Sequence, residues 1–449
     1  MSDPQQFVVY PSQAIRGTVR VPGDKSISHR SVMLGALAQG TTQVKGFLQG
    51  ADAMATLRAF QAMGVPISEP NDGVLTIQGV GLHGLSAPTH ALDMGNSGTA
   101  MRLMAGILAG QPFASTLTGD ASLSKRPMQR VTAPLAQMGA QVETQTQGTP
   151  PLSISPAAEL KGIDYTLPMA SAQVKSCLMF AGLYAQGQTC ITEPAPTRDH
   201  PARMFRGFGL DVATERLDEQ RTRVCLSGGA QLTATQIDVP TDISSAAFFM
   251  VAALITPDSD LLIEHVGINP TRTGVIDILK RMGADLTLEN QTEVGGEPVA
   301  DIRVRSSQLR GIEIPKQTVP LAIDEFPVIF VAASAAQGTT VLTGAEELRV
   351  KESDRIQVMA DGLQALGIKA IPTPDGMEIT GGPQETQRAP IASHHDHRIS
   401  MAMAVAGLRA PAPICIDDCA NVNTSFPSFV ALMQQVGLSI EVRSTLSCE

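Results

Sequence analysis

The apolar and polar positions of this chain follow two patterns that recur at the same interval. In the first, an amphipathic helical run ends at a large apolar residue, and Gly and a strand-like segment follow it. Six segments show this pattern: AFQAMGVPI, PLAQMGAQV, MFRGFGLDV, ILKRMGADL, GLQALGIKA and LMQQVGLSI. Their glycines recur every 70 to 84 residues: Gly64, Gly139, Gly209, Gly283, Gly367 and Gly437. Because glycine adopts left-handed φ without steric cost, we expect each to follow the end of a helix directly.

The second pattern is a helix that is apolar on nearly all sides and leads into a β-branched strand. Its six copies are SVMLGALAQGTTQVKG, GTAMRLMAGILAGQPFASTLTG, AQVKSCLMFAGLYAQGQTCITE, ISSAAFFMVAALITPDSDLLIEH, FPVIFVAASAAQGTTVLTG and ISMAMAVAGLRAPAPICIDD. A helix that is apolar all round is buried, so the amphipathic helices of the first pattern form an outer layer. The two patterns together predict an α/β protein of six repeats of about 75 residues, three in each of two domains.

Composition and charge narrow the class of protein. The chain has 449 residues, 43% of them hydrophobic and 17% charged, as in globular proteins of more than one domain. Its net charge of −10 argues against a general nucleic-acid binder, which needs a basic face. Apolar runs such as FFMVAALI are too short to span a membrane, and MSDPQQFVVY does not resemble a signal peptide. We therefore expect a cytoplasmic monomer whose six cysteines are reduced.

Cations gather in polar strings at or beside the starts of the buried helices, although the chain as a whole is acidic. Nine occur there: Lys25, Arg30, Lys125, Arg126, Lys175, Arg198, Lys351, Arg355 and Arg398. Each string alone is equally typical of a helix cap or an exposed ion pair. Because they come from both halves of the chain, they indicate a small polyanionic substrate clamped between the two domains.

Carboxylates accompany these cations. Asp324 and Glu325 stand just before the buried helix FPVIFVAASAA, and Glu352 lies within LRVKESDR. A carboxylate before such a helix either complements the helix dipole or lies at a domain edge with a shifted pKa. The three histidines of SHHDHR lack a partner set, so no metal is expected. GVGLHG has no helix after it, and neither a P-loop nor a GxSxG motif is present, which argues against nucleotide-binding and ordinary hydrolase sites.

In this order, GDKSISHR, GNSGTAMR, SLSKRPM, MASAQVKS, TRDH, IDEFP, EELRVKESDR and DHR resemble the 5-enolpyruvylshikimate-3-phosphate synthases (EPSP synthases), above all the class II bacterial branch. The resemblance covers about residues 11 to 440. It implies a two-domain inside-out α/β barrel, the enolpyruvyl transferase fold. One domain, 1–21 plus 239–449, would be interrupted by the other, 22–238, with the active site in the cleft between them.

The same resemblance implies a reaction without a cofactor. The enolpyruvyl group of phosphoenolpyruvate (PEP) passes to the 5-hydroxyl of shikimate 3-phosphate, and phosphate is released, on the pathway to chorismate and the aromatic amino acids. These two small molecules would be the partners. In the catalytic set, Asp324 would accept the hydroxyl proton, Glu352 would handle protons at the PEP methylene carbon, and Lys25 would contact both substrates.

Binding roles carry over motif by motif. The residues implied for shikimate 3-phosphate are Lys25, Ser26, Arg30, Ser171, Gln173, Arg198, Asp324 and Lys351. Those implied for PEP are Lys25, Gly98, Arg126, Gln173, Arg355 and Arg398. In one departure, Thr424 stands where class I members place a Lys, so the PEP clamp is one cation lighter.

Two other functions stay open at this point. UDP-N-acetylglucosamine enolpyruvyl transferases share the fold but usually carry a reactive loop cysteine in the first-domain portion, whereas the first cysteine here, Cys177, lies inside an apolar helix. A non-catalytic protein that binds phosphorylated metabolites is the second alternative. Release of phosphate from shikimate 3-phosphate plus PEP distinguishes all three.

Overall fold

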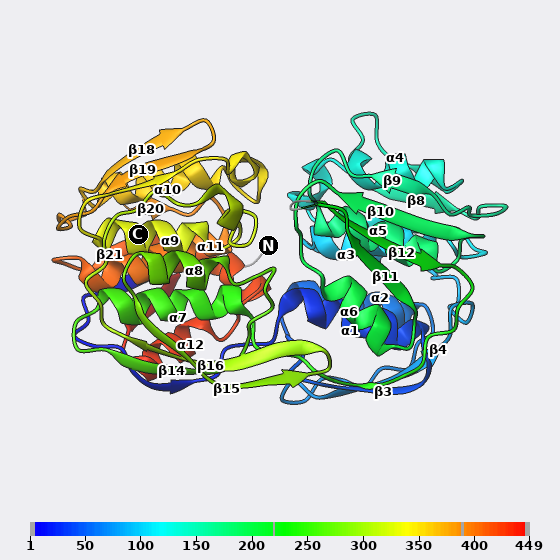
Figure 1. Cartoon of the computed structure of the whole chain (residues 1–449), viewed down its shortest axis with the longest axis horizontal. Coiled ribbons are helices and arrows are strands. Elements are labelled where there is room, and N and C mark those ends of the chain that lie inside the picture. The colour runs from blue at the N-terminus through cyan, green and yellow to red at the C-terminus, as the bar shows by residue number, and fades with distance from the viewer. Residues whose placement is uncertain (1–4, 219–220, 388–389, 445–449) are drawn as a thin grey trace. The chain divides into compact units, whose positions relative to one another are not determined.

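The chain forms two compact units. The computed structural model describes residues 5–218, 221–387 and 390–444. Unit 1 combines the described residues up to Pro22 with Pro240–Thr292 and those from Pro298 onward. Unit 2 is Gly23–Val239 together with the short segment Glu293–Glu297. Unit 1 is therefore discontinuous in sequence, as the colours of Figure 1 show.

Six buried helices form the interior of the units, as the second sequence pattern predicts. They are α1 (Lys25–Leu37), α3 (Gly98–Leu108) and α5 (Ala172–Gly182) in unit 2, and α7 (Ile243–Ile255), α9 (Phe326–Ala335) and α11 (His397–Ala406) in unit 1. Helix α3 packs on α5, and α7, α9 and α11 pack on one another. Each unit has its own apolar core around these helices, which include Phe180 in unit 2 and Phe249 and Phe330 in unit 1.

Polar side chains start most of the buried helices. Five of the six have a capping oxygen that accepts a hydrogen bond from a backbone N–H of the first turn, from Asp24, Ser97, Ser171, Asp242 and Asp396. The sixth, α9, has Pro327 in its first turn instead. The polar strings of the sequence thus do cap helices, and the same strings carry the candidate site residues.

Six further helices alternate with the buried ones along the chain. They are α2 (Ala51–Ala62), α4 (Gln129–Gln137), α6 (His200–Gly207), α8 (Gly274–Arg281), α10 (Arg355–Ala365) and α12 (Phe429–Val436). The repeat glycine after each has a φ between +79° and +116°. The expected left-handed glycine after each helix is confirmed, and with it the six-fold repeat.

The described strands form three sheets in each unit. Those of unit 2 are β13 (Gln236–Asp238)–β3 (Gln39–Lys45)–β4 (Leu75–Val80), β5 (Leu92–Asp93)–β6 (Ser115–Thr118)–β8 (Leu152–Ser155)–β7 (Gln141–Glu143), and β11 (Val212–Arg216)–β12 (Thr222–Ser227)–β10 (Gln188–Glu193)–β9 (Asp164–Thr166). Those of unit 1 are β20 (Ile391–Ala392)–β21 (Ile414–Asp417)–β1 (Gln5–Tyr10)–β22 (Ser439–Ser444), β15 (Asp285–Val294)–β16 (Glu297–Arg305)–β14 (Asp260–Gly267)–β2 (Arg16–Val19), and β17 (Thr339–Leu342)–β19 (Gly376–Thr380)–β18 (Lys369–Thr373).

Most of these sheets combine a parallel pair with antiparallel neighbours. In one, β10 runs parallel to β9 and antiparallel to β12. Three of the parallel pairs, β5–β6, β9–β10 and β20–β21, join strands separated by one buried helix. The parallel pairs β3–β13 and β2–β14 and the antiparallel pairs of β1 with β21 and β22 join strands that are distant in sequence. Three sheets around three buried helices in each unit, all of them mixed except the antiparallel sheet β17–β19–β18, give the predicted inside-out α/β architecture.

The expectation that all six cysteines are reduced is wrong. Cys190 and Cys225 form a disulfide that joins β10 to β12. They lie directly opposite each other in the antiparallel register, with their Cα atoms 4.1 Å apart. The two cysteines are 35 positions apart in the sequence, so their proximity follows only from the strand pairing, which the sequence pattern does not give. Cys177, Cys415 and Cys419 are free thiols, and Cys448 lies outside the described residues.

Within the described ranges, every helix is too short or too polar to cross a membrane.

Candidate functional site

In unit 2, the first turns of α1 hold three of the predicted site residues. Lys25 Nζ lies 2.9 Å from Asp52 Oδ2, which comes from the first turn of α2. Arg30 is buried and donates from Nη2 to Ser176 Oγ at 2.6 Å and from Nη1 to the backbone oxygen of Ser26 at 2.9 Å. Its guanidinium is thereby fixed beside the start of the helix.

A second guanidinium joins this group from the loop before α6. Arg198 Nη1 donates to Ser26 Oγ at 2.9 Å. Burial, and then the nearby charge of Arg198, lower the pKa of Arg30 to about 10. Two guanidinium groups held together at a helix N-terminus repel each other, and an anion between them relieves that repulsion. The arrangement is suited to a phosphate group.

The starts of α3 and α5 form the second part of the unit 2 site. Ser171 caps α5, and Gln173 in its first turn accepts a hydrogen bond from Arg102 Nη1 at 2.6 Å. Gln173 Nε2 also donates to Thr99 Oγ1 at 3.0 Å, which ties the two helix starts together. Gly98 begins α3, and a methyl group there would lie 3.2 Å from Arg126 Nη1. Gly98, Arg126 and Gln173 are thus neighbours at one helix end.

Two residues of this site were missed in the sequence. Arg102 lies one helical turn after Gly98, and that spacing was a usable signal because both residues share a helix face. Asp52 is 27 residues from Lys25, and the sequence offers no sign of their pairing. Lys175, counted above among the substrate-facing cations, is instead buried and paired with Glu193.

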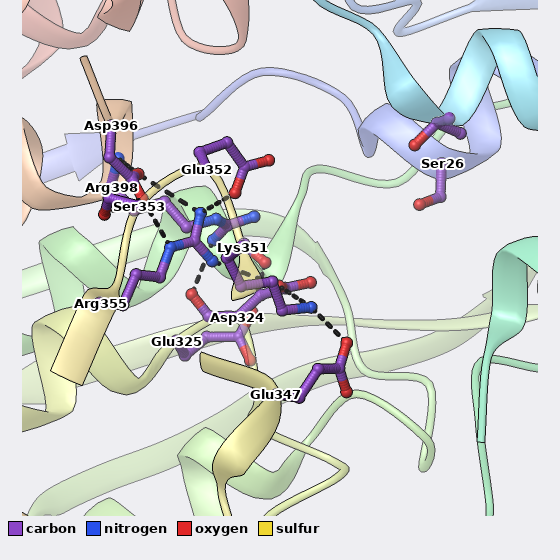
Figure 2. A network of polar contacts seen from close by, with 12 residues as sticks. Ser26, Asp324, Glu325, Glu347, Lys351, Glu352, Ser353, Arg355, Asp396 and Arg398 are labelled. Carbon is purple, nitrogen blue, oxygen red and sulfur yellow. Dashed lines mark hydrogen bonds and ion pairs between the residues drawn. The ribbon is translucent and has the colours of Figure 1, made fainter. Parts of the chain in front are cut away.

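In unit 1, Asp324 lies at the centre of a cluster of cations (Figure 2). Its Oδ1 is 3.5 Å from Lys351 Nζ and 3.6 Å from Arg355 Nη1. Its backbone oxygen accepts a hydrogen bond from Arg398 Nη1 at 3.0 Å. The loop before α9, the start of α10 and the start of α11 therefore meet at Asp324.

Asp396 holds the two arginines of this cluster in place. It is fully buried, accepts from Arg355 Nε at 2.8 Å and accepts from the backbone N–H of Arg398 at 3.0 Å. Burial alone would raise the Asp396 pKa, but the charge of Arg355, its hydrogen bond and the effect of His397 together outweigh burial and keep the pKa below its usual value. Arg355 also donates from Nη2 to Glu352 Oε2 at 2.6 Å. The acid Glu352 thus lies within hydrogen-bonding distance of the cluster.

Two ionisable groups close to Asp324 in space or in sequence, Lys351 and Glu325, have shifted pKa values. Burial disfavours the charge on Lys351, but the carboxylates of Asp324 and Glu347 outweigh burial and raise the Lys351 pKa. Glu325 points elsewhere: Ser244 Oγ donates to it and Arg272 Nη2 lies 3.7 Å away. Burial raises the Glu325 pKa. Of the two acids in IDEFP, only Asp324 belongs to the cation cluster.

One group of three potential metal ligands occurs in the described part of the chain: Asp199, His200 and Glu297. His200 Nδ1 lies 2.8 Å from Glu297 Oε1, and Arg203 Nε lies 2.8 Å from Asp199 Oδ2. These groups are already engaged in hydrogen bonds within the protein, so the arrangement is typical of a buried polar network.

Comparison with known proteins gives a consistent result. The family model described as EPSP synthase (3-phosphoshikimate 1-carboxyvinyltransferase) matches residues 9–433. A 3-phosphoshikimate 1-carboxyvinyltransferase from Hydrogenovibrio crunogenus is 68% identical over 98% of this chain and 99% of its own length. One from Methylococcus capsulatus is 63% identical over 97% of this chain and 98% of its own.

Solved structures agree. An EPSP synthase from Acinetobacter baumannii has a TM-score of 0.88 and 58% identity, covering 98% of this chain and 100% of that one. The enolpyruvyl transferase NikO from Streptomyces tendae has a TM-score of 0.77 at 16% identity, over 99% of this chain and 100% of its own. At this identity the match shows a similar fold and nothing more.

Proposed function

The chain belongs to the EPSP synthase family, and on that premise we propose which of its residues bind the substrates and move the protons. It is an enzyme of the shikimate pathway that transfers the enolpyruvyl group of PEP to the 5-hydroxyl of shikimate 3-phosphate and releases phosphate. The observation that carries this conclusion is the full-length identity of 68% to a relative with that activity in its name.

We propose that the α1 end of unit 2 binds the phosphate of shikimate 3-phosphate. The two guanidinium groups of Arg30 and Arg198, which Ser26 holds together, support this assignment. Ser171 and Gln173 would contact the same substrate from the start of α5. In unit 1, Asp324 and Lys351 would complete its binding site. Each charge-assisted hydrogen bond of this kind contributes about 1.5–3 kcal/mol.

PEP is proposed to bind to two sets of cations. In unit 2 these are Lys25 and Arg126, with Gln173 and the backbone of Gly98 at the start of α3. In unit 1 they are Arg355 and Arg398, which Asp396 orients. Thr424 donates to the backbone oxygen of Asn421 at 2.7 Å and brings no charge to this set.

Both clusters are needed for the chemistry, so we propose that the two units are domains that act together on one pair of substrates. Asp324 takes the proton from the 5-hydroxyl of shikimate 3-phosphate while the hydroxyl oxygen attacks the central carbon of PEP. Glu352 gives a proton to the methylene carbon, which yields a tetrahedral intermediate. When the C–O bond to phosphate breaks, Glu352 takes back a proton from the methyl group. Lys351 and Arg355 stabilise the negative charge of Asp324 before it accepts its proton.

Release of inorganic phosphate tests this function. Purified protein with shikimate 3-phosphate and PEP should release phosphate and form the enolpyruvyl product, which mass spectrometry identifies. UDP-N-acetylglucosamine with PEP is the matched control and should give none. The described cysteines of unit 2 are buried in a helix or bonded to each other, so a reactive thiol of the kind expected in the alternative family is absent from this part of the chain. Light scattering will test the further proposal that the enzyme is a monomer.

A further inference from the structure

A closed network of three side chains lies behind the α1 end of unit 2. Lys175, one helical turn after Ser171 on α5, is 1% exposed, and Glu193 at the end of β10 is 2% exposed. Lys175 Nζ lies 2.8 Å from Glu193 Oε2 and donates to Thr197 Oγ1 at 2.9 Å. The Thr197 hydroxyl donates in turn to Glu193 Oε1.

Stability alone is a weak reason for such a network. Burial lowers the pKa of Lys175, and Glu193 counteracts that effect. A buried ion pair seldom stabilises a fold more than apolar side chains of similar volume, because desolvation offsets the attraction. The ion pair does fix the orientation of the Thr197 hydroxyl, because each of the three side chains is hydrogen-bonded to the other two. A role in positioning a neighbouring group follows from this.

The network adjoins both arginines of the proposed phosphate site, Arg198 in sequence and Arg30 through a hydrogen bond. Thr197 directly precedes Arg198, and Ser176, which directly follows Lys175, accepts the hydrogen bond from Arg30. The segment between β10 and α6 that carries Arg198 has no helix or strand of its own. Arg198 is also repelled by Arg30, whose pKa reflects that proximity. In addition to the hydrogen bond from Arg198 to Ser26, the Thr197 hydroxyl attaches this segment to the buried ion pair and opposes that repulsion.

We propose that Lys175, Glu193 and Thr197 are positioning residues that hold Arg198 beside Arg30, so that both guanidinium groups meet the phosphate of shikimate 3-phosphate together. The Thr197 hydroxyl is the link between the buried ion pair and the Arg198 segment. This inference rests on the proposed binding roles of Arg30 and Arg198. It predicts that the ion pair contributes to the affinity for shikimate 3-phosphate and not to the catalytic rate or to the affinity for PEP.

Thr197→Val tests the link without leaving either charge of the ion pair unpaired. The expected result is a rise of about tenfold in KM for shikimate 3-phosphate, the size of one hydrogen bond, with kcat and KM for PEP within twofold of wild type. Thr197→Ser keeps the hydroxyl and should restore the wild-type KM. Thr189→Val is the control, since Thr189 is a buried threonine of β10 whose hydroxyl has no hydrogen-bond partner among the residues that the structure describes.

A double-mutant cycle with Arg198→Ala separates positioning from general destabilisation. If Thr197 acts through Arg198, then Thr197→Val should change KM by less than twofold in the Arg198→Ala background. Independent, multiplying effects would overturn the proposal, as would an unchanged KM in Thr197→Val or a loss of kcat that Thr197→Ser does not rescue. Wild-type turnover is measured in the same assay. Absence of wild-type turnover would contradict the proposed reaction, whereas the outcomes above concern only the role of Thr197.

Discussion

At the scale of single residues, the carboxylates of unit 1 differ in role according to what surrounds them. Asp324, Asp396 and Glu325 all lie near arginines. Asp396 is enclosed and bonded to Arg355 and to the start of α11, while Glu325 turns to Ser244 and Arg272. Asp324 remains partly exposed, with 17% of its side chain accessible. It is therefore the acid of these three that a substrate hydroxyl can reach.

Replacing Asp324 by Asn should abolish most turnover while substrate still binds. The amide keeps the shape of the side chain but takes up no proton, and loss of such a group typically costs roughly 10²–10⁴ in rate. We expect kcat to fall in that range and the Kd of shikimate 3-phosphate, measured by calorimetry, to change by less than tenfold.

Glu347→Gln is the matched control for Asp324→Asn. Glu347 also pairs with Lys351, at 2.6 Å, but its side chain is half exposed and has no proposed role in proton transfer. This variant should keep near-normal kcat. Near-normal turnover in Asp324→Asn itself would remove that residue from the role of base.

A buried histidine in unit 2 should make the protein sensitive to acid. His29 is fully buried, and its Nδ1 lies 2.7 Å from Thr56 Oγ1. Burial lowers its pKa from 6.5 to about 3, so below pH 6.5 the unfolded chain binds a proton that the folded chain does not. Stability should fall as pH drops from 6.5 towards 3 and be independent of this group above 6.5. The full effect is at most about 5 kcal/mol, at 1.36 kcal/mol per pKa unit.

Urea unfolding between pH 4 and 7.5 measures this effect. The variant His29→Asn should show a flatter dependence of the unfolding free energy on pH than wild type. His395→Asn is the control, because His395 is 81% exposed. If the His29 variant keeps the full wild-type slope over this range, another group is responsible for the acid sensitivity.

At the scale of elements, the repeat glycines offer a direct test of the pattern that predicts the fold. Gly209 follows α6 with a φ of +86°, and nothing lies closer than 3.6 Å to where its Cβ would be. Gly209→Ala therefore introduces backbone strain without a clash. The cost of left-handed φ for a residue with a Cβ is about 1–2 kcal/mol, so the midpoint of thermal unfolding should fall by a few degrees.

The neighbouring Gly207 provides the control for this prediction. It is the last residue of α6, its φ is not left-handed and a Cβ there would meet no atom of the described residues within 4 Å. Gly207→Ala should leave the midpoint unchanged or raise it, because alanine favours the helix. Equal effects of the two substitutions would show that left-handed φ is not what position 209 requires.

These glycines also show why elements were predictable from the sequence where their pairings were not. Helix ends and buried helices follow from local spacing and apolar pattern, and all six copies of each are present among the described residues. Contacts distant in sequence leave no such trace. The disulfide between Cys190 and Cys225 depends on strand register, and the salt bridge from Lys25 to Asp52 depends on how α1 meets α2.

The sequence predicted which types of residue form the candidate site, but not always which partners their side chains contact. A lysine at the start of a buried helix is compatible with substrate binding or with an internal ion pair. Lys25 is the first residue of α1 and Lys175 the fourth of α5, and Lys175 is enclosed with Glu193 while 23% of the Lys25 side chain is exposed. Only the position of the distant carboxylate decides between the two, and sequence spacing does not give it.

At the scale of the whole molecule, the proposed reaction needs cations from both units at one pair of substrates. Shikimate 3-phosphate should therefore compact and stabilise the protein, since its phosphate and its hydroxyl are assigned to groups in different units. A ligand at 100 times its Kd that binds only the folded state adds about 2.7 kcal/mol to the unfolding free energy. We expect a higher melting temperature and a smaller radius of gyration in small-angle scattering.

Shikimate without its phosphate is the control ligand, and the same concentration should produce neither change, because it lacks the charge that Arg30 and Arg198 are proposed to bind. A rise in melting temperature with an unchanged radius of gyration would mean that binding stabilises the units without drawing them together. In that case the groups of unit 1 would have to reach the substrates by some other route.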